Sequence, residues 1–213
     1  MKSFPGVRSV LLDWDGTLLD SCAADRRAYA RMFRALGIPW SIEDYDRQYS
    51  PDWYRVYRAA GIPRPRWAEA DETWRRFYAR EKPVLLPGAR GVLRRLRRRF
   101  TLGLVTSGDR SRVKKQLRVL GLSGHFAVRV CSQDASRRKP HPAPLQTAMR
   151  LLDVKPGECL YVGDTAEDVE MSRRAGVLVV GVLGPFPTHA RLRAARPDAL
   201  IPSVRELPAL LEI

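Results

Sequence analysis

Short apolar runs that alternate with amphipathic stretches dominate the pattern of this chain. Runs rich in aliphatic and β-branched residues occur at positions 7–12, 102–106, 127–131, 159–162 and 178–182. Each run has the length of a buried strand. Helical patterns at 110–120 and 167–175 lie between the later runs, and a glycine closes each pattern. Strands that alternate with helices predict an α/β fold with a doubly wound, parallel, Rossmann-like sheet.

One long interval breaks this alternation. Between residues 19 and 86 no strand pattern is visible, and helical stretches occur instead. They cover residues 21–37, 42–48, 50–61 and 66–82. Ser21 is predicted to cap the first, and Ser50 with Pro51 is predicted to begin the third. We therefore expect a small all-helical cap at 19–86, inserted into a core formed by residues 1–18 and 87–213.

The composition predicts a folded protein without a membrane segment. Hydrophobic residues make up 45% and charged residues 29% of the 213 positions, which is ordinary for a globular chain. No apolar run approaches the ~18 residues of a membrane span, and the N-terminal run ends at Asp13 without a targeting pattern. The cysteines Cys22, Cys131 and Cys159 have no metal-binding spacing. We expect reduced thiols and a cytoplasmic location.

The formal charge of +15 is the strongest oddity of the composition. Such a charge would attract nucleic acid or other anions. However, 32 of the 38 basic residues are arginines, a bias that genomic base composition alone can produce. In the arginine-rich segment 94–99 the apolar positions form one stripe, which leaves the arginines on a solvated face. A nucleic-acid partner is therefore not expected, although it stays an alternative.

Two acidic segments carry the candidate chemistry. Asp13 and Asp15 follow the first predicted strand, and residues two apart in a strand share a face. Asp164 and Asp168 follow the strand at 159–162. Because ligands of open α/β sheets bind at the carboxyl ends of the strands, these carboxylates are expected to meet there. They would repel one another without a cation, so the pattern indicates a Mg²⁺ site that also accepts a phosphate oxygen.

Other groups suited to a phosphate ester accompany the carboxylates. Gly16 lets the backbone approach an anion closely. Thr106 and Ser107 follow the strand at 102–106, and Lys139 offers a compact positive charge. Trp14 is expected to pack rather than to take part in chemistry, and so is His141, which lies between two prolines.

The four segments together resemble the motifs of the haloacid dehalogenase superfamily. They are Asp13-Trp14-Asp15-Gly16-Thr17-Leu18, Val105-Thr106-Ser107, Lys139-Pro140-His141-Pro142 and Gly163-Asp164 with Asp168. Their order and the position of the insert resemble the phosphoglycolate phosphatase-like branch, which has a helical cap. The resemblance covers nearly the whole chain.

The resemblance implies a role for each matching residue. Asp13 would attack phosphorus, form an aspartyl-phosphate and bind Mg²⁺. Asp15 would bind the metal through its backbone carbonyl, and its side chain would act as general acid and then general base. Thr106 and Lys139 would hold the phosphoryl group. Asp164 would be a side-chain metal ligand, which Asp168 would orient.

The substrate is predicted only as a small phosphorylated metabolite. Arg26 and Arg27, in the first turns of the insert, are candidates to bind a second anionic group of that substrate. A phosphomutase of the β-phosphoglucomutase type is the nearest alternative, but its Ser-Arg-x-x-Ser-Leu-like loop is not found between residues 19 and 86. A dehalogenase is disfavoured because that chemistry needs no acid such as Asp15.

Overall fold

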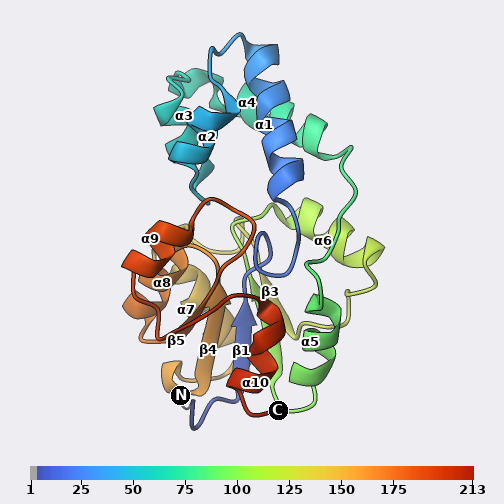
Figure 1. The fold of residues 1–213 in the computed structure, drawn as a ribbon, viewed down its shortest axis with the longest axis vertical. Coiled ribbons are helices and arrows are strands. Elements are labelled where there is room, and N and C mark those ends of the chain that lie inside the picture. Colours follow the sequence, from blue (N-terminus) through green and yellow to red (C-terminus); the bar gives the residue numbers. More distant parts are fainter. Residues whose placement is uncertain (1–3) are drawn as a thin grey trace. The chain divides into compact units, whose positions relative to one another are not determined.

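A computed structural model describes residues 4–213, and the larger of its two compact units is built on a six-stranded parallel sheet (Figure 1). The strand order is β3-β2-β1-β4-β5-β6. The strands are β1 (Ser9–Leu12), β2 (Thr101–Val105), β3 (Val128–Val130), β4 (Cys159–Gly163), β5 (Leu178–Val182) and β6 (Ala199–Ile201). The chain winds outward from β1 in both directions, so the predicted doubly wound α/β fold is confirmed.

Helices cover the two faces of this sheet. They are α5 (Ala89–Leu96), α6 (Arg110–Val119), α7 (Ala143–Leu152), α8 (Ala166–Ala175), α9 (His189–Ala194) and α10 (Leu207–Leu210). Short 3₁₀ turns lie at Pro156–Glu158 and Val204–Glu206. The helices predicted at 110–120 and 167–175 are both present. Helix α6 ends one residue earlier than predicted, and helix α8 begins one residue earlier.

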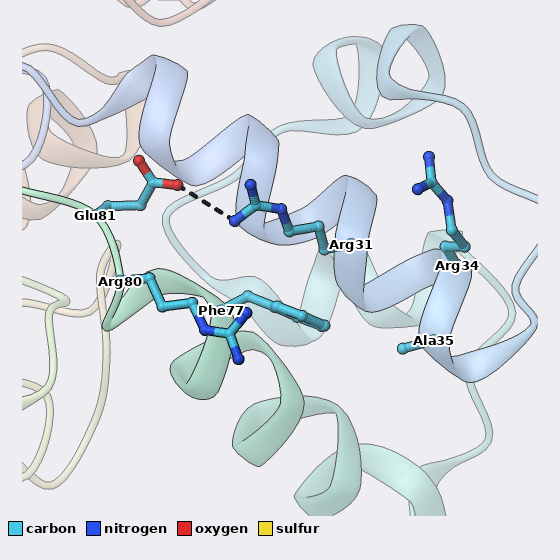
Figure 2. A pocket seen from close by; sticks show the side chains of 6 residues that line it. All are labelled: Arg31, Arg34, Ala35, Phe77, Arg80 and Glu81. Atoms are coloured by element: carbon cyan, nitrogen blue, oxygen red, sulfur yellow. Dashed lines mark ion pairs between the residues drawn. The ribbon is translucent and has the colours of Figure 1, made fainter.

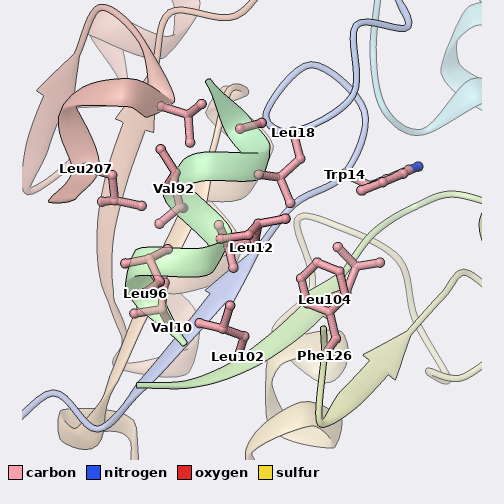
Figure 3. Close-up of a cluster of buried hydrophobic side chains, with 14 of the residues drawn as sticks. Val10, Leu12, Trp14, Leu18, Val92, Leu96, Leu102, Leu104, Phe126 and Leu207 are labelled. Atoms are coloured by element: carbon pink, nitrogen blue, oxygen red, sulfur yellow. The ribbon is translucent and has the colours of Figure 1, made fainter. Parts of the chain in front are cut away.

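Strand alternation sends the side chains of β1 into two separate cores. Val10 and Leu12 pack with residues of α5, α6 and α10, as Figure 3 shows for part of this cluster. Leu11 packs on the other face with residues of α7, α8 and α9. All three side chains are fully buried. Burial of both faces explains why β1 is a continuous apolar run rather than an alternating one.

The sixth strand was not predicted from the sequence. β6 contains only three residues and pairs with β5 at one edge of the sheet. A three-residue strand is too short to give a recognisable alternation. The other predicted strands are present, and their observed bounds differ from the predicted ones by at most two residues.

A second compact unit, Ser21–Lys82, is all helical. It contains α1 (Cys22–Leu36), α2 (Ile42–Gln48), α3 (Trp53–Ala59), a 3₁₀ turn at Arg64–Arg66 and α4 (Trp67–Tyr78). Helices α1 and α4 pack against each other. Aromatic rings stack inside the unit, for example Tyr29 on Tyr45 with centroids 4.4 Å apart. The buried carboxylate of Asp25 accepts hydrogen bonds from the Tyr45 hydroxyl and the Trp74 indole.

The helical unit is shorter at both ends than the predicted insert of 19–86. Its flanks belong to the sheet unit, which comprises the described chain up to Asp20 together with Pro83–Ile213. The flanks pair with each other as extended chain, because Leu19 forms an antiparallel bridge with Leu85. The backbone amide of Asp20 also donates to the carbonyl of Val84. These backbone bonds account for the difference in bounds.

Of two predicted helix caps, Ser21 occupies the N-cap position of α1 as predicted, whereas the predicted cap at Ser50 is wrong. The side chain of Ser21 makes no capping hydrogen bond at the start of α1. Helix α3 begins at Trp53, and its N-cap is Asp52, whose carboxylate accepts from the amide of Tyr54. The hydroxyl of Ser50 instead accepts from the amide of Asp52. A serine and an aspartate two positions apart offer two possible caps, and the local turn decides between them.

Within residues 4–213, the helices are all too short or too polar to cross a lipid bilayer.

Candidate active site

The candidate residues meet where the strand order changes direction. β1 lies between β2 and β4, with Leu12 opposite Leu104 on one side and Val162 on the other. Asp13, Thr106 and Asp164 directly follow these three strands. Parallel strands bring their carboxyl ends to one edge, and the point where the order reverses is the usual ligand crevice of such sheets.

A buried lysine connects two of the carboxylates. The Nζ of Lys139 lies 2.9 Å from Oδ1 of Asp13 and 2.8 Å from Oδ1 of Asp168. It also lies 2.7 Å from the hydroxyl of Tyr161, which is on β4. All four side chains are almost completely buried. The structure therefore brings Asp13, Asp168 and Lys139 together.

Asp168 is held by the start of helix α8. Its carboxylate accepts from the backbone amide and the hydroxyl of Thr165, while the Thr165 hydroxyl accepts from the amide of Asp168. This capping box fixes the first turn of the helix. A Cβ at Gly163 would collide with the Asp168 side chain, so a glycine is needed there. Asp168 is thus oriented by its own helix.

Asp164 lies against the loop that follows β1. Its Oδ1 accepts from the hydroxyl of Thr17 at 3.0 Å, and its backbone carbonyl accepts from Thr188 at 2.7 Å. Gly16 has φ +82°, and a Cβ there would clash with Oδ2 of Asp164 and with Phe186. Only glycine combines that left-handed backbone with so close an approach.

Burial and the neighbouring charges together set the protonation of this cluster. Burial raises the pKa of Asp13 to about 7, against the opposing effect of Lys139. Burial, followed by the charges of Asp13 and Asp168, also raises the pKa of Asp164 well above its ordinary value. Burial alone would lower the pKa of Lys139, but the two carboxylates beside it raise that pKa above its ordinary value. The lysine is therefore a fixed positive charge.

The acidic residues fit a divalent cation. One oxygen from each of Asp13, Asp164 and Asp168 lies within 4.8 Å of the others. Within the part of the chain that the structure describes, Oδ2 of Asp164 is buried without a hydrogen-bond partner. An unpaired buried carboxylate oxygen is costly unless a ligand compensates it. Three carboxylates around one point form a hard oxygen donor set suited to Mg²⁺.

Asp15 does not belong to this group through its side chain. Its carboxylate instead pairs with Arg112 of α6, with Nη1–Oδ1 at 3.0 Å and Nη2–Oδ2 at 2.6 Å. Thr106 is buried, and its hydroxyl accepts from the amide of Gly108 at 3.0 Å. Ser107, next to it, is half-buried.

Trp14 is packed in the core, as expected, and His141 is half-buried in a local turn. The indole of Trp14 is fully buried and donates to the side chain of Gln116 at 2.9 Å. The Nδ1 of His141 accepts from the amide of Ala143 at the start of α7.

Arg26 and Arg27 are both engaged in ion pairs inside the helical unit. Arg26 pairs with Asp46, and Arg27 pairs with Glu81 at 2.5 Å. Glu81 also lines an open hollow of that unit, together with Phe77 and three arginines (Figure 2). The three are Arg31, Arg34 and Arg80. Arg31 lies 3.6 Å from Glu81, and Figure 2 shows Arg34 pointing away from that pair. The arginines therefore do not converge on one point.

Tyr161, Thr17 and Arg112 are contacts of the site that sequence reasoning missed. Tyr161 carries the one signal that could have revealed it, a hydroxyl within an otherwise apolar strand. Arg112 is 97 positions from Asp15 in the chain, so no local pattern connects the two.

Comparisons with known proteins identify the family of this chain. The model of the haloacid dehalogenase-like hydrolases matches residues 10–182. A plasmid-encoded phosphoglycolate phosphatase of Cupriavidus necator is 35% identical, over 95% of this chain and 92% of the relative. The pyrophosphatase PpaX of Oceanobacillus iheyensis is 26% identical over 94% of this chain and 95% of the relative.

A solved structure supports the same assignment. A hydrolase from Pseudomonas syringae superimposes with a TM-score of 0.84 at 26% identity, covering 97% of this chain and 99% of that one. The family match spans most of the sheet unit and the whole insert. This chain belongs to the haloacid dehalogenase-like hydrolases, in the branch that resembles phosphoglycolate phosphatases.

Proposed function

We propose that this protein is a Mg²⁺-dependent phosphatase that hydrolyses a small phosphorylated metabolite through an aspartyl-phosphate on Asp13. The observation that carries the proposal is the surroundings of Asp13, which is buried against Lys139 and within 4.8 Å of oxygens of Asp164 and Asp168. A phosphate ester repels an anionic nucleophile, so its hydrolysis requires positive charge at this place.

In the first step an oxygen of Asp13 attacks phosphorus, and the bond from phosphorus to the ester oxygen breaks. Asp15, in its protonated form, gives its proton to that leaving oxygen. Lys139 offsets the charge of Asp13, and the Thr106 hydroxyl with the Ser107 and Gly16 backbone holds the phosphoryl oxygens. Bound Mg²⁺, held by Asp13, Asp164 and the Asp15 carbonyl, would neutralise phosphoryl charge.

In the second step a water molecule attacks the phosphorus of the aspartyl-phosphate. Asp15, now a carboxylate, takes a proton from this water, and the bond between phosphorus and the Asp13 oxygen breaks. Inorganic phosphate leaves, and Asp13 is regenerated. Asp168 would complete the carboxylate set around the cation, and its 2.8 Å ion pair with Lys139 would also keep that lysine in place.

Phosphoglycolate is the first substrate to test, because the phosphoglycolate phosphatase of Cupriavidus necator is 35% identical to this chain. Pyrophosphate is the second, given the similarity to PpaX. Arg26 and Arg27 stay candidates for binding a second anionic group of the substrate, and such a role would require them to exchange Asp46 and Glu81 for that group. The cytoplasmic location likewise stays a prediction.

The test is phosphate release from a panel of phosphorylated metabolites with Mg²⁺. Asp13→Asn should reduce kcat by more than about 10³-fold, since it removes the nucleophile, and EDTA should abolish turnover. Asp153→Asn is the matched control, because Asp153 is exposed and asparagine tolerates its left-handed backbone (φ 53°). Full activity in EDTA, or in the Asp13 variant, would contradict the mechanism.

The phosphomutase alternative is separated by the product. Incubation with a sugar 1-phosphate should release inorganic phosphate. An isomerised sugar phosphate would instead identify a mutase.

A further inference from the structure

The ion pair between Asp15 and Arg112 differs from the ion pair that Arg110 of the same helix, α6, forms with Asp134. The two Nη atoms of Arg112 donate to different oxygens of Asp15, Nη1 to Oδ1 at 3.0 Å and Nη2 to Oδ2 at 2.6 Å. The two side chains are only 16% and 22% exposed. Arg110, two positions earlier on the same helix, pairs with Asp134 but is 61% exposed. An ion pair with two hydrogen bonds that is largely shielded from water fixes the orientation of both side chains. A solvated ion pair restrains its side chains little.

Arg112 is itself held in place by neighbouring groups. Its Nη1 lies 3.3 Å from the side-chain oxygen of Gln116, one turn further along α6. That oxygen also accepts from the indole of the fully buried Trp14, next to Asp15 in the chain. Trp14 therefore joins the β1 loop to the helix that carries Arg112.

The start of helix α6 places the backbone of Arg112. Asp109 caps this helix and accepts from the amides of Ser111 and Arg112. A Cβ at Gly108 would collide with Nη2 of Arg112. The guanidinium therefore occupies space that the glycine leaves open, beside the loop that begins with Thr106.

We infer that Arg112 is a positioning residue that orients the Asp15 carboxylate for its two proton transfers. The inference rests on the proposed function, in which Asp15 must reach first the leaving oxygen and then the attacking water. A carboxylate on a loop can rotate about its side-chain bonds, and the two-point contact with Arg112 restricts that rotation. Proton transfer requires the groups to be within hydrogen-bond reach, so lost orientation lowers its rate.

The dependence of the rate on the leaving group tests this role. The leaving oxygen of an alkyl phosphate needs a proton, whereas 2,4-dinitrophenolate leaves without one. The value of kcat/KM reports the steps up to the first irreversible one, here departure of the leaving group. It is therefore not affected by the later hydrolysis of the aspartyl-phosphate.

We expect Arg112→Gln to lower kcat/KM for phosphoglycolate, or for the best alkyl phosphate of the panel, by about 10²-fold. The same variant should change kcat/KM for 2,4-dinitrophenyl phosphate by less than about threefold, because that step needs little acid catalysis. Arg112→Lys, which keeps the charge but not the fork, should restore only part of the alkyl phosphate activity. Arg110→Gln is the matched control and should change neither value.

Equal losses on the two substrates would overturn the inference, because they would indicate a purely structural role. A loss confined to KM of the anionic alkyl phosphate would also overturn it and would identify Arg112 as a substrate-binding residue. Thermal unfolding of each variant shows whether it is folded. If Arg112→Gln does not fold, the two substrates are compared with Arg112→Lys instead. A wild-type protein that hydrolyses neither substrate with Mg²⁺ would instead contradict the proposed function.

Discussion

At the scale of single residues, the surroundings of Lys139 explain how this lysine can be both charged and buried. Three oxygen atoms, from Asp13, Asp168 and Tyr161, lie within 2.9 Å of its Nζ. An ammonium group has three protons, so each can face one acceptor. Full pairing compensates the cost of burial.

The first prediction concerns the neutral member of this set. Tyr161→Phe should lower the free energy of unfolding by about 1–3 kcal/mol, because it leaves a proton of Lys139 without an acceptor in a buried place. The lost hydroxyl also lies 3.0 Å from the carbonyl of Val105. Urea unfolding measures the change, which should move the midpoint and leave the slope unaltered. An unchanged midpoint would mean that water or another group replaces the hydroxyl.

At the scale of elements, the loops after β1 and β5 touch backbone to backbone. A Cβ at Gly184 would collide with the carbonyl of Gly16. The imidazole of His189 and the carbonyl of Gly184 are hydrogen-bonded at 2.7 Å, so the second loop is tied to the start of α9. Neither backbone can yield without moving the residues that surround Asp164.

The second prediction follows from this contact. Gly184→Ala should destabilise the fold by about 1–3 kcal/mol, since the methyl group meets backbone rather than a flexible side chain. It should also reduce phosphatase activity, because the Gly16 loop would shift. Gly157→Ala is the control, as a Cβ there meets nothing within 4 Å. Thermal unfolding and phosphate release of the two variants are compared. Equal behaviour of both would show that the loops adapt.

The elements also show what the sequence can and cannot predict. Helix α2 has the predicted bounds, and each end of α1 lies within one residue of the predicted range 21–37. These patterns are local. The predicted start of α3 was wrong because Ser50 and Asp52 compete as caps. The contact of Arg112 with Asp15 was not predicted because the two residues are distant in the chain. Local periodicity predicts elements, whereas contacts between loops require the assembled sheet.

At the scale of the whole molecule, the buried carboxylates connect stability to pH and to metal. The pKa of Asp13 is raised to about 7 in the folded protein, above its ordinary value of 3.8. Between these two values the folded state therefore holds a proton that the unfolded state has lost. Without metal, the contribution of Asp13 to stability must fall as the pH rises through this window. The raised pKa of Asp164 acts in the same direction.

The third prediction is that Mg²⁺ stabilises the protein more at pH 8 than at pH 5.5. Mg²⁺ binds the deprotonated carboxylates, so it competes with protons at the lower pH and removes the repulsion between charges at the higher pH. At 100 times its dissociation constant an ion bound only by the folded state adds about 2.7 kcal/mol. Thermal unfolding with and without Mg²⁺ at both pH values measures the difference.

Asp13→Asn separates the charge of Asp13 from other effects of the ion. This variant keeps the shape of the side chain but has no proton to lose, so the increase of the Mg²⁺ effect with pH should become smaller. Asp153→Asn should retain the full increase, because that exposed carboxylate lies outside the three-carboxylate cluster. A Mg²⁺ effect at pH 5.5 as large as that at pH 8 in the unaltered protein would exclude the buried carboxylates as its source. The ion would then act on the folded state through a different site.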